Sequence, residues 1–392
     1  MFRKVWMSVG LLAVCAMFTI SCGGGGGDVD TKMKEFVANY AKLVYANYQD
    51  VEKGIKELQT AIDALVSNPS AETLKAAKDK WLTVRNPYGA TEVYRFYGGP
   101  IDDERGLEGR INAWPLDENY IDYVKNAAES GIINMTADFP KIEEKVLSDA
   151  NEKGGEKNIA LGWHAIEFLL WGQDMSDSSA GQRPHTDFVS GGNGTAKNQD
   201  RRGEYLKIVT TVLLKDVQTV MADWAPDKAD NYAGKMTSGD AKAALTKILT
   251  GMGKLSGGEL SGERMTTPYT EKDQEEEHSC FSDNTKNDIL YNAKGVQNVY
   301  LGKYGSVSGT SLDALVRLKD PAMADTMKQQ LEASIAAIQA IPDPFDQAIK
   351  GDDSSEGRKK VKAAIDALQA QAATIAKIAK LFDITITTTL DE

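Results

Sequence analysis

The chain has 392 residues, of which 42% are hydrophobic and 26% are charged, the composition of an ordinary globular protein. Its formal net charge of −12 gives an acidic surface that repels phosphate groups, so we exclude nucleic acid as a partner. A single hydrophobic core rarely grows beyond about 250–300 residues, and two subdomains are therefore expected.

The first 21 residues have the organisation of an export signal. A basic start is followed by an apolar run at residues 9–20, too short to span a bilayer, and then by Cys22. A cysteine at the cleavage position resembles a bacterial lipobox, although Thr19 stands where leucine is usual. We predict a signal peptide of residues 1–21 and a lipidated Cys22 that anchors the protein in the envelope, on the outer membrane, facing the periplasm or the surface. An ordinary cleaved signal with a product that carries no lipid is the alternative.

Five glycines at residues 23–27 predict a flexible tether, so residues 22–32 are interpreted as a lipidated cysteine and a glycine-rich spacer. Cys15 lies inside the signal, which leaves Cys280 as the only cysteine of the mature domain after Cys22 and excludes an internal disulfide. No later stretch reaches the length of a transmembrane helix. The lipid is therefore the only membrane contact that we predict.

The remaining chain has the periodicity of helices. Apolar residues between Met33 and Val66 recur every three or four positions, which is the spacing of one helical face. Further helices are predicted at residues 70–84, 205–220, 241–252, 323–341 and 358–382. Alternation typical of a strand occurs only in the short tail, residues 383–392. We predict an all-α protein with two helix-bundle-like halves, residues 33–200 and 201–382.

Two loop-rich stretches interrupt these helices. Residues 88–115 combine glycines with aromatic and charged side chains, among them Asp102 and Glu104, and this composition predicts a packed loop with a function. Residues 174–200 are rich in glycine, serine and asparagine and are expected to form a looser surface excursion that carries His185.

His164 and Glu167 are three positions apart in an apolar helical run, residues 162–171, and so project from the same side of a helix. An imidazole and a carboxylate placed in this way can bind one metal ion together. The alternative, which the spacing alone favours, is a His–Glu hydrogen bond inside a helical core. Ala165 and Ile166 fill the gap, so the motif holds no general base, unlike the H-E-x-x-H motif of zinc peptidases.

His278 lies in a second segment whose residues could form a functional site, between Glu277 and Asp283 and close to Cys280. Acids, an imidazole and a thiol within a few residues suit metal binding. An acidic helix end before the next N-cap is the alternative and is slightly favoured. A Cys–His peptidase is less well supported, because no oxyanion-binding setting accompanies the thiol.

Together these segments resemble the imelysin family of bacterial envelope proteins. Gly162, His164 and Glu167 match the family motif G-x-H-x-x-E. Further blocks that carry the resemblance lie at residues 88–92, 99–102, 114–122, 260–265, 277–284, 287–290 and 297–300. The resemblance spans about residues 35–380, nearly the whole chain after the signal.

The resemblance implies an all-helical protein of two bundle-like halves with a site near their interface. Proteins of this family are described as insulin-cleaving metallopeptidases, as iron-regulated envelope proteins and as a domain of a ferrous-iron uptake component. The motif carries over His164 and Glu167 as metal candidates. Further candidates for the site are Asp102, Glu104, Glu277, His278 and Asp283.

We therefore expect an envelope lipoprotein that binds a divalent metal, iron or zinc, and that is linked to iron uptake or homeostasis, with iron-uptake components among its partners. A zinc-type metallopeptidase is the second hypothesis. It would need a general base from outside the His164–Glu167 pair, such as Glu104 or Glu277, and we do not expect it. A scaffold or ligand-binding lipoprotein that holds no metal is the third.

Overall fold

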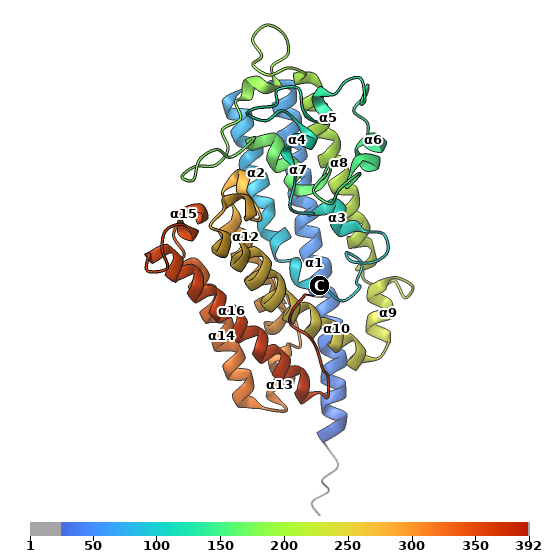
Figure 1. Cartoon of the computed structure of the whole chain (residues 1–392). Coiled ribbons are helices and arrows are strands. Elements are labelled where there is room, and N and C mark those ends of the chain that lie inside the picture. The colour runs from blue at the N-terminus through green and yellow to red at the C-terminus, as the bar shows by residue number, and fades with distance from the viewer. Residues whose placement is uncertain (1–24, 391–392) are drawn as a thin grey trace, which may run out of the picture.

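The longest helix, α1 (Gly25–Ser67), runs along most of the molecule and contacts helices of both halves (Figure 1). The computed structural model describes residues 25–390, with side chains from Asp28 onward. The apolar face expected from the sequence is fully buried, as at Tyr40, Leu43, Val51 and Leu58. The helix begins at Gly25 rather than Met33, so residues 25–32 are helical and the tether prediction was wrong for them. The signal and Cys22 lie outside the described residues.

The helices that follow α1 pack mainly around its C-terminal part. Helices α2 (Ala71–Gly89), α7 (Gly162–Trp171) and α8 (Gln199–Asp223) form the body of this region, since α1 contacts α2 and α8, and α7 contacts both. Shorter helices accompany them: α3 (Leu107–Ile111), α4 (Glu118–Ile121), α5 (Gly131–Asn134) and α6 (Glu144–Ala150). Helix α9 (Tyr232–Ser238) lies elsewhere, against α1 and α10. Because α8 packs on α1 and α7, it belongs to the N-terminal region. Most of α8 follows residue 200, which we expected to be the boundary between the two halves.

The C-terminal region is a second layer of helices. Its elements are α10 (Ala241–Lys254), the π-helix η3 (Leu255–Thr266), α11 (Thr267–Glu271), α12 (Thr285–Leu301), α13 (Leu312–Arg317), α14 (Pro321–Gln339), α15 (Phe345–Ile349) and α16 (Glu356–Leu381). A single β-hairpin, β1 (Lys303–Tyr304) with β2 (Val307–Ser308), is the only sheet within residues 25–390. Helix α16 packs against α14, η3 and α10. The all-α prediction is confirmed.

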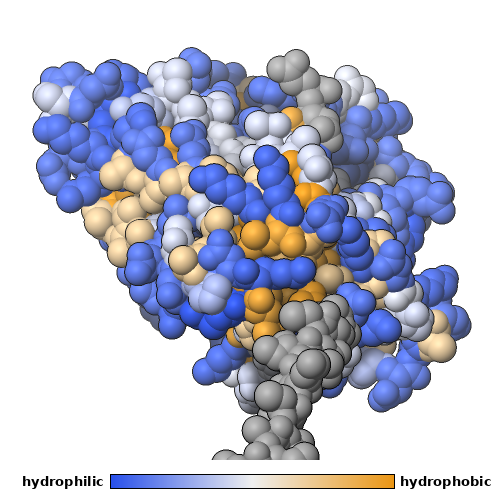
Figure 2. Space-filling view, turned by 90° about the horizontal axis from the view of Figure 1, so that it is seen from below, coloured by the Kyte–Doolittle hydropathy of each residue, from blue (hydrophilic) through white to orange (hydrophobic). Residues whose placement is uncertain are grey.

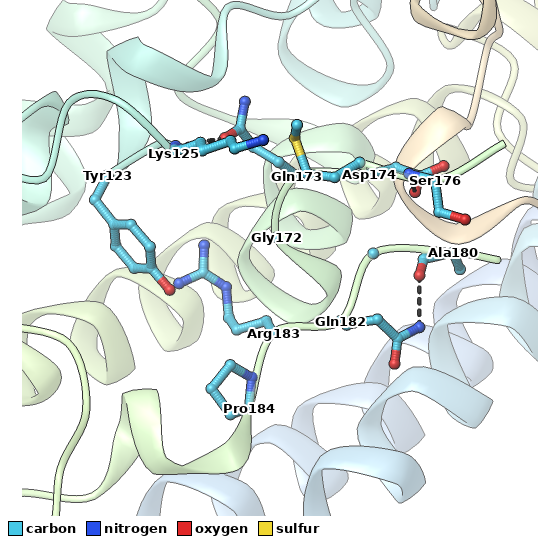
Figure 3. A pocket seen from close by; sticks show the side chains of 12 residues that line it. Tyr123, Lys125, Gly172, Gln173, Asp174, Ser176, Ala180, Gln182, Arg183 and Pro184 are labelled. Atoms are coloured by element: carbon cyan, nitrogen blue, oxygen red, sulfur yellow. Dashed lines mark hydrogen bonds between the residues drawn. The ribbon is translucent and has the colours of Figure 1, made fainter.

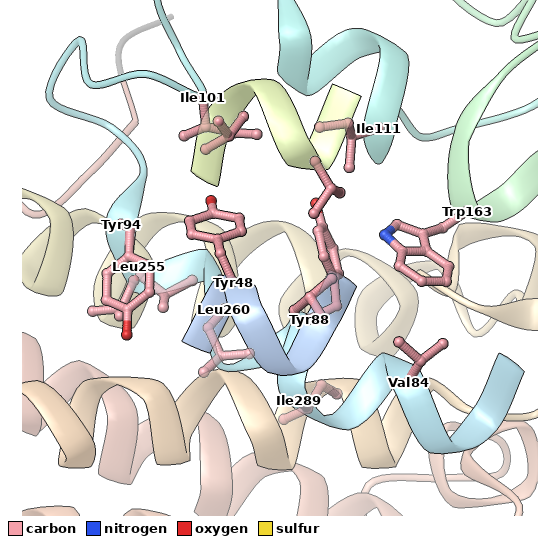
Figure 4. Close-up of a cluster of buried hydrophobic side chains, with 14 of the residues drawn as sticks. Tyr48, Val84, Tyr88, Tyr94, Ile101, Ile111, Trp163, Leu255, Leu260 and Ile289 are labelled. Atoms are coloured by element: carbon pink, nitrogen blue, oxygen red, sulfur yellow. The ribbon is translucent and has the colours of Figure 1, made fainter. Parts of the chain in front are cut away.

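The two regions share one hydrophobic core. Tyr48 from α1, Tyr88 from α2, Trp163 from α7 and Ile289 from α12 belong to the same buried cluster (Figure 4). Trp163 stacks edge-to-face on Trp81, with ring centroids 6.4 Å apart. The buried apolar residues thus form a continuous set across the interface, and the elements that carry the site are fixed relative to one another.

One of the two loop-rich stretches agrees with the expectation from the sequence, and the other does not. Residues 88–115 are packed, as predicted, and contain η1 (Glu92–Tyr94) and α3. Residues 174–200 are not a loose excursion throughout, because Arg183 and Asp187 are buried and form an ion pair at 3.0 Å. Arg183 also pairs at 2.9 Å with buried Asp122. Charges paired in the interior hold this loop on the body of the protein.

No helix among the described residues is both long enough and apolar enough to cross a membrane. Viewed from below, at the end where α1 begins, apolar side chains gather inside a hydrophilic rim (Figure 2).

Candidate functional site

Helix α7 carries the G-x-H-x-x-E motif and starts in direct contact with the main chain of α3. Gly162 has φ +84°, a conformation that residues with a side chain rarely adopt, and a Cβ there would lie 2.5 Å from the carbonyl oxygen of Ile111. The glycine is therefore required by the backbone, because only a residue without a Cβ lets α7 begin at this point.

His164 and Glu167 form a hydrogen-bonded pair in the core. The Nδ1 atom of His164 lies 2.9 Å from Oε2 of Glu167, and both side chains are fully buried. This is the His–Glu hydrogen bond that the spacing alone favoured. It leaves Nε2 of His164 as a buried nitrogen without a hydrogen-bond partner among the described residues. One ring nitrogen of His164 thus has Glu167 as its partner, and the other has no partner among the described residues.

Glu167 is held from the C-terminal region by Ser282, in η5 (Cys280–Ser282). Its Oε1 atom accepts the backbone N–H of Ser282 at 3.0 Å and the Ser282 hydroxyl at 2.6 Å. Both carboxyl oxygens therefore already have partners. Burial raises the pKa of Glu167 to about 8 even though the Ser282 hydrogen bonds oppose the shift. Burial also lowers the pKa of His164 well below its ordinary value, with Arg85 and Arg264 adding to the effect.

His278 is the second imidazole of the site. Its ring centroid lies 4.7 Å from that of His164, with an interplanar angle of 79°. Trp114 packs against both rings, at 4.9 Å and 6.4 Å between centroids. Burial lowers the pKa of His278 well below its ordinary value, so both imidazoles are neutral and can act as ligands.

Asn112 orients His278. Its Oδ1 accepts a hydrogen bond of 2.7 Å from Nη1 of Arg85, so its Nδ2 faces Nε2 of His278, at 3.4 Å. Arg85 in turn forms a bidentate ion pair with Asp288, at 3.2 and 2.8 Å. Asp288 also accepts hydrogen bonds from the Ser279 hydroxyl (2.5 Å) and from Asn284 (3.0 Å). This network joins α2, α12 and the segment that carries His278, and it fixes the imidazole before any ligand arrives.

An acidic cleft of about 410 Å³ leads from the surface to His278. Asn112 and Trp114 lie in its wall, together with Arg95 and Arg264. Six glutamates line it: Glu108, Glu152, Glu156, Glu259, Glu263 and Glu276. Both arginines pair with the buried carboxylate of Glu92, at 3.0 Å from Arg95 and 2.5 Å from Arg264. Arg95 also pairs with Glu108 at 3.2 Å, and Arg264 with Glu259 at 2.9 Å. The other four glutamates have no arginine partner within the described part of the chain, so the net charge of the cleft is negative and attracts cations.

The other candidates from the sequence fall in different places. Asp102 accepts the backbone N–H of Phe96 at 2.5 Å and lies 3.5 Å from Arg95, so it stabilises the loop and does not line the cleft. Glu104 is exposed and does not line the cleft either. Glu277 and Asp283 flank η5 but belong to a separate group of carboxyls. Of these candidates, the structure brings together His164, Glu167 and His278.

Cys280 and His185 have no role in this arrangement. Cys280 is buried, and burial raises the pKa of its thiol well above the ordinary value, so it lacks the thiolate that a nucleophile needs. His185 is half-buried in η2 (His185–Phe188) and is not part of the cleft wall. Sequence reasoning missed Ser282, Asn112 and Trp114. Ser282 and Trp114 lie in two of the blocks that carry the family resemblance, but neither residue type by itself indicates a site.

The fold and the site define an all-α protein in which a buried G-x-H-x-x-E helix meets a second histidine at the foot of an acidic cleft. The sequence model of the imelysin family (Peptidase_M75) matches residues 44–375, and the chain belongs to this family.

Three relatives frame this assignment. Iron-regulated protein A of Synechococcus elongatus is 24% identical over 355 residues, covering 88% of this chain and 85% of that protein. A crystal structure of a putative iron-regulated protein A precursor from Parabacteroides distasonis has a TM-score of 0.71 at 24% identity, covering 90% of this chain and 95% of that one. A crystal structure of an imelysin-like protein from Psychrobacter arcticum has a TM-score of 0.64 at 14% identity, covering 92% of this chain and 98% of that one. The two solved structures share the fold.

Proposed function

We propose that this protein is an envelope lipoprotein that binds a divalent transition-metal ion, with His164 and His278 as ligands, in a role linked to iron. The observation that carries the proposal is the buried Nε2 atom of His164, which has no hydrogen-bond partner among the described residues and whose ring lies 4.7 Å from that of His278. A buried nitrogen of this kind costs free energy unless something binds it.

The residues present fit a metal. A ligating histidine usually hydrogen-bonds a carboxylate through its other ring nitrogen, and this partner orients the ring and raises its basicity. Glu167 stands in that position on Nδ1 of His164, so we assign it as a positioning residue rather than a ligand. Imidazole ligands near carboxylates suit ferrous iron and zinc. The glutamates of the cleft would concentrate such cations at its mouth.

The link to iron rests on relatives and on the expected location. Iron-regulated protein A of Synechococcus elongatus, by its name, responds to iron, and it covers most of this chain. The sequence of the first 22 residues supports export and lipidation of Cys22. Anchored there, the end of the molecule where α1 begins would face the membrane, and the apolar surface in Figure 2 lies on that end.

The geometry of the site argues against the peptidase hypothesis, although the family model carries a peptidase name. Glu167 has both oxygens engaged, and neither Glu104 nor Glu277 lines the cleft. His164 is fully buried, so a peptide bond has no route to it. The remaining alternative, a scaffold that binds no metal, is decided by titration.

The test is calorimetric titration of ferrous iron, without oxygen, and of zinc into the purified protein and its variants. His164→Ala and His278→Ala should each lower the affinity more than tenfold, and Glu167→Gln should lower it about 10–100-fold through the loss of positioning. His185→Ala is the matched control and should change nothing. Circular dichroism shows which variants remain folded. Equal affinities in all five proteins would overturn the proposal.

A further inference from the structure

A second group of acidic side chains lies apart from the two histidines. Asp174 follows α7, Asp283 follows η5, and Asp346 belongs to α15. One carboxylate oxygen from each of the three lies within 4.8 Å of the others. Glu277, between η4 (Gln274–Glu276) and η5, faces Asp346. Three segments that are far apart in sequence thus bring four carboxyls to one place.

The buried members of this group lack partners. Glu277 and Asp346 are fully buried, and neither oxygen of either carboxyl has a hydrogen-bond donor in good geometry within the described residues. Thr285 is near enough to lower the pKa of Glu277, but burial and the neighbouring Asp346 outweigh it and raise that pKa well above its ordinary value. The Oδ1 atom of Asp283 is also without one. Asp174 accepts the backbone N–H of Ser176 at 3.0 Å. A buried carboxylate must find a proton or a cation, because its isolation in the interior is costly.

No side-chain cation neutralises the group. Within residues 25–390, no lysine or arginine forms an ion pair with any of the four carboxyls. Lys350 is close enough to lower the pKa of Asp174 and Asp346, but its ammonium group pairs with Asp177, at 3.1 Å. Burial, reinforced by the neighbouring carboxyls, raises the pKa of Asp174 to about 6 and that of Asp283 to about 7. These shifts are those of acids left together without a counter-charge.

The geometry matches a hard cation. Oxygens bound to one Ca²⁺ at about 2.4 Å lie at most about 4.8 Å apart, so the three aspartates can share an ion after small side-chain movements. All the donors are oxygens, which suit Ca²⁺, Mg²⁺ or Mn²⁺ rather than the softer metals that imidazoles favour. We propose that Asp174, Asp283 and Asp346 form a binding site for a hard divalent cation, best fitted by calcium, with the unpartnered carboxylate of Glu277 beside it.

The site has a route to solvent. Asp174 lines an open pocket of about 330 Å³ together with Gln173, Ser176 and Arg183 (Figure 3). The pocket lies along the loop after α7, and Asp174 and Ser176 are at one end of it. A hydrated cation could therefore reach Asp174 from outside and shed water as the other carboxylates bind it.

A cation there would act as a clamp. It would join the loop after α7 to α15 and to the segment 277–283, which supplies His278 and Ser282 to the histidine site. This inference stands independently of the proposed function, since its ligands and its preferred metals differ.

The experiment is a calcium titration of the purified protein after treatment with a chelator, followed by calorimetry and by thermal unfolding. Calcium should bind the wild type and raise its Tm by several degrees. Asp346→Asn and Asp174→Asn should each lower the calcium affinity at least tenfold. Asp138→Asn, which removes an exposed acid outside this group, is the matched control and should stay within twofold of the wild type. His164→Ala should also bind calcium normally, which separates this site from the histidine site.

A second measurement keeps the inference testable if a variant is altered in stability. Without cations, Asp346→Asn should unfold at a higher temperature than the wild type, because it removes one of several mutually repelling buried carboxyls. With calcium, that order should reverse. Binding of magnesium or manganese through the same residues would support the site and change only its metal. If cations have no effect on the wild type, or if Asp346→Asn binds calcium as tightly as the wild type, the cation site is overturned. The remaining explanation would then be a group of carboxyls that are neutralised by shared protons.

Discussion

Ser282 donates two hydrogen bonds to one oxygen of Glu167, from its backbone N–H at 3.0 Å and from its hydroxyl at 2.6 Å, across 115 positions of sequence. The contact joins α7 to η5, and therefore the N-terminal helices to the C-terminal ones. Because the other oxygen of Glu167 holds His164, the orientation of the imidazole depends on a serine in the opposite region of the protein. The motif helix alone does not make the site.

Ser282→Ala should destabilise the protein by about 1–3 kcal/mol, because it removes the donor of a short buried hydrogen bond. The backbone N–H remains, so the fold should persist while the imidazole becomes less well held. We expect metal affinity to fall by less than in Glu167→Gln. Urea unfolding and titration measure the two effects. Ser179→Ala, at an exposed serine, is the control, and an equally small effect at both serines would contradict the assignment.

Gly162→Ala should destabilise the protein by at least about 2 kcal/mol, because a Cβ at φ +84° is strained and would collide with the carbonyl of Ile111. Gly192→Ala is the matched control, since a Cβ there meets nothing within 4 Å. Urea unfolding of the two variants should separate them clearly. Similar stability would mean that α7 can start without a glycine.

Glu92→Gln should cost about 3 kcal/mol or more, because Arg264 and Arg95 would lose a buried counter-charge. Burial alone would raise the pKa of Glu92, but the two arginines outweigh it and hold the pKa at about 2, against an ordinary value of 4.5. The carboxylate therefore stabilises the fold fully above pH 4.5, and this contribution disappears as the pH falls toward 2.

The check is denaturant unfolding of wild type and Glu92→Gln at neutral pH and at several pH values below 4.5. The stability gap between them should narrow as the solution becomes more acidic. Glu104→Gln, at an exposed acid, should follow the wild type throughout. A gap that stays constant with pH would contradict the electrostatic account.

Metal-loaded protein should not cleave an insulin chain. The buried His164 offers no site for a scissile bond, and Glu167 has no free oxygen with which to activate water. Mass spectrometry of insulin B chain after long incubation with iron or zinc is the measurement. Metal-dependent cleavage that disappears in His164→Ala would establish the peptidase hypothesis instead.

Much of the fold could be predicted because helical faces are local patterns. The apolar spacing after Met33 predicted α1, and the long helices predicted at residues 323–341 and 358–382 correspond to α14 and α16 within two residues at each end. The first turns of α1 were missed, since five glycines in a row have low helix propensity. The packed loop around Arg183 was missed because its glycines and serines predict a mobile surface loop. The ion pairs that hold it, with Asp122 and Asp187, are formed by tertiary packing and leave no pattern in the sequence.

The candidate site was predictable only as far as its residues are neighbours on one helix. The three-residue spacing of His164 and Glu167 predicted their contact, and the hydrogen bond confirms it. The approach of His278 could be expected from the family resemblance but not from spacing. Nothing local indicates that Asp174 and Asp346 meet, because their proximity is created by tertiary packing of segments with no shared pattern.

The central claim is that His164 and His278 bind a metal ion directly. X-ray absorption at the zinc edge of zinc-loaded protein tests it, since imidazole ligands give nitrogen scatterers at about 2.0–2.1 Å with a characteristic outer-shell signal. The account predicts two imidazoles in the wild type, one or none in His164→Ala and in His278→Ala, and an unchanged spectrum in His185→Ala. A wild-type spectrum with only oxygen ligands, or one that is the same in all four proteins, would contradict it.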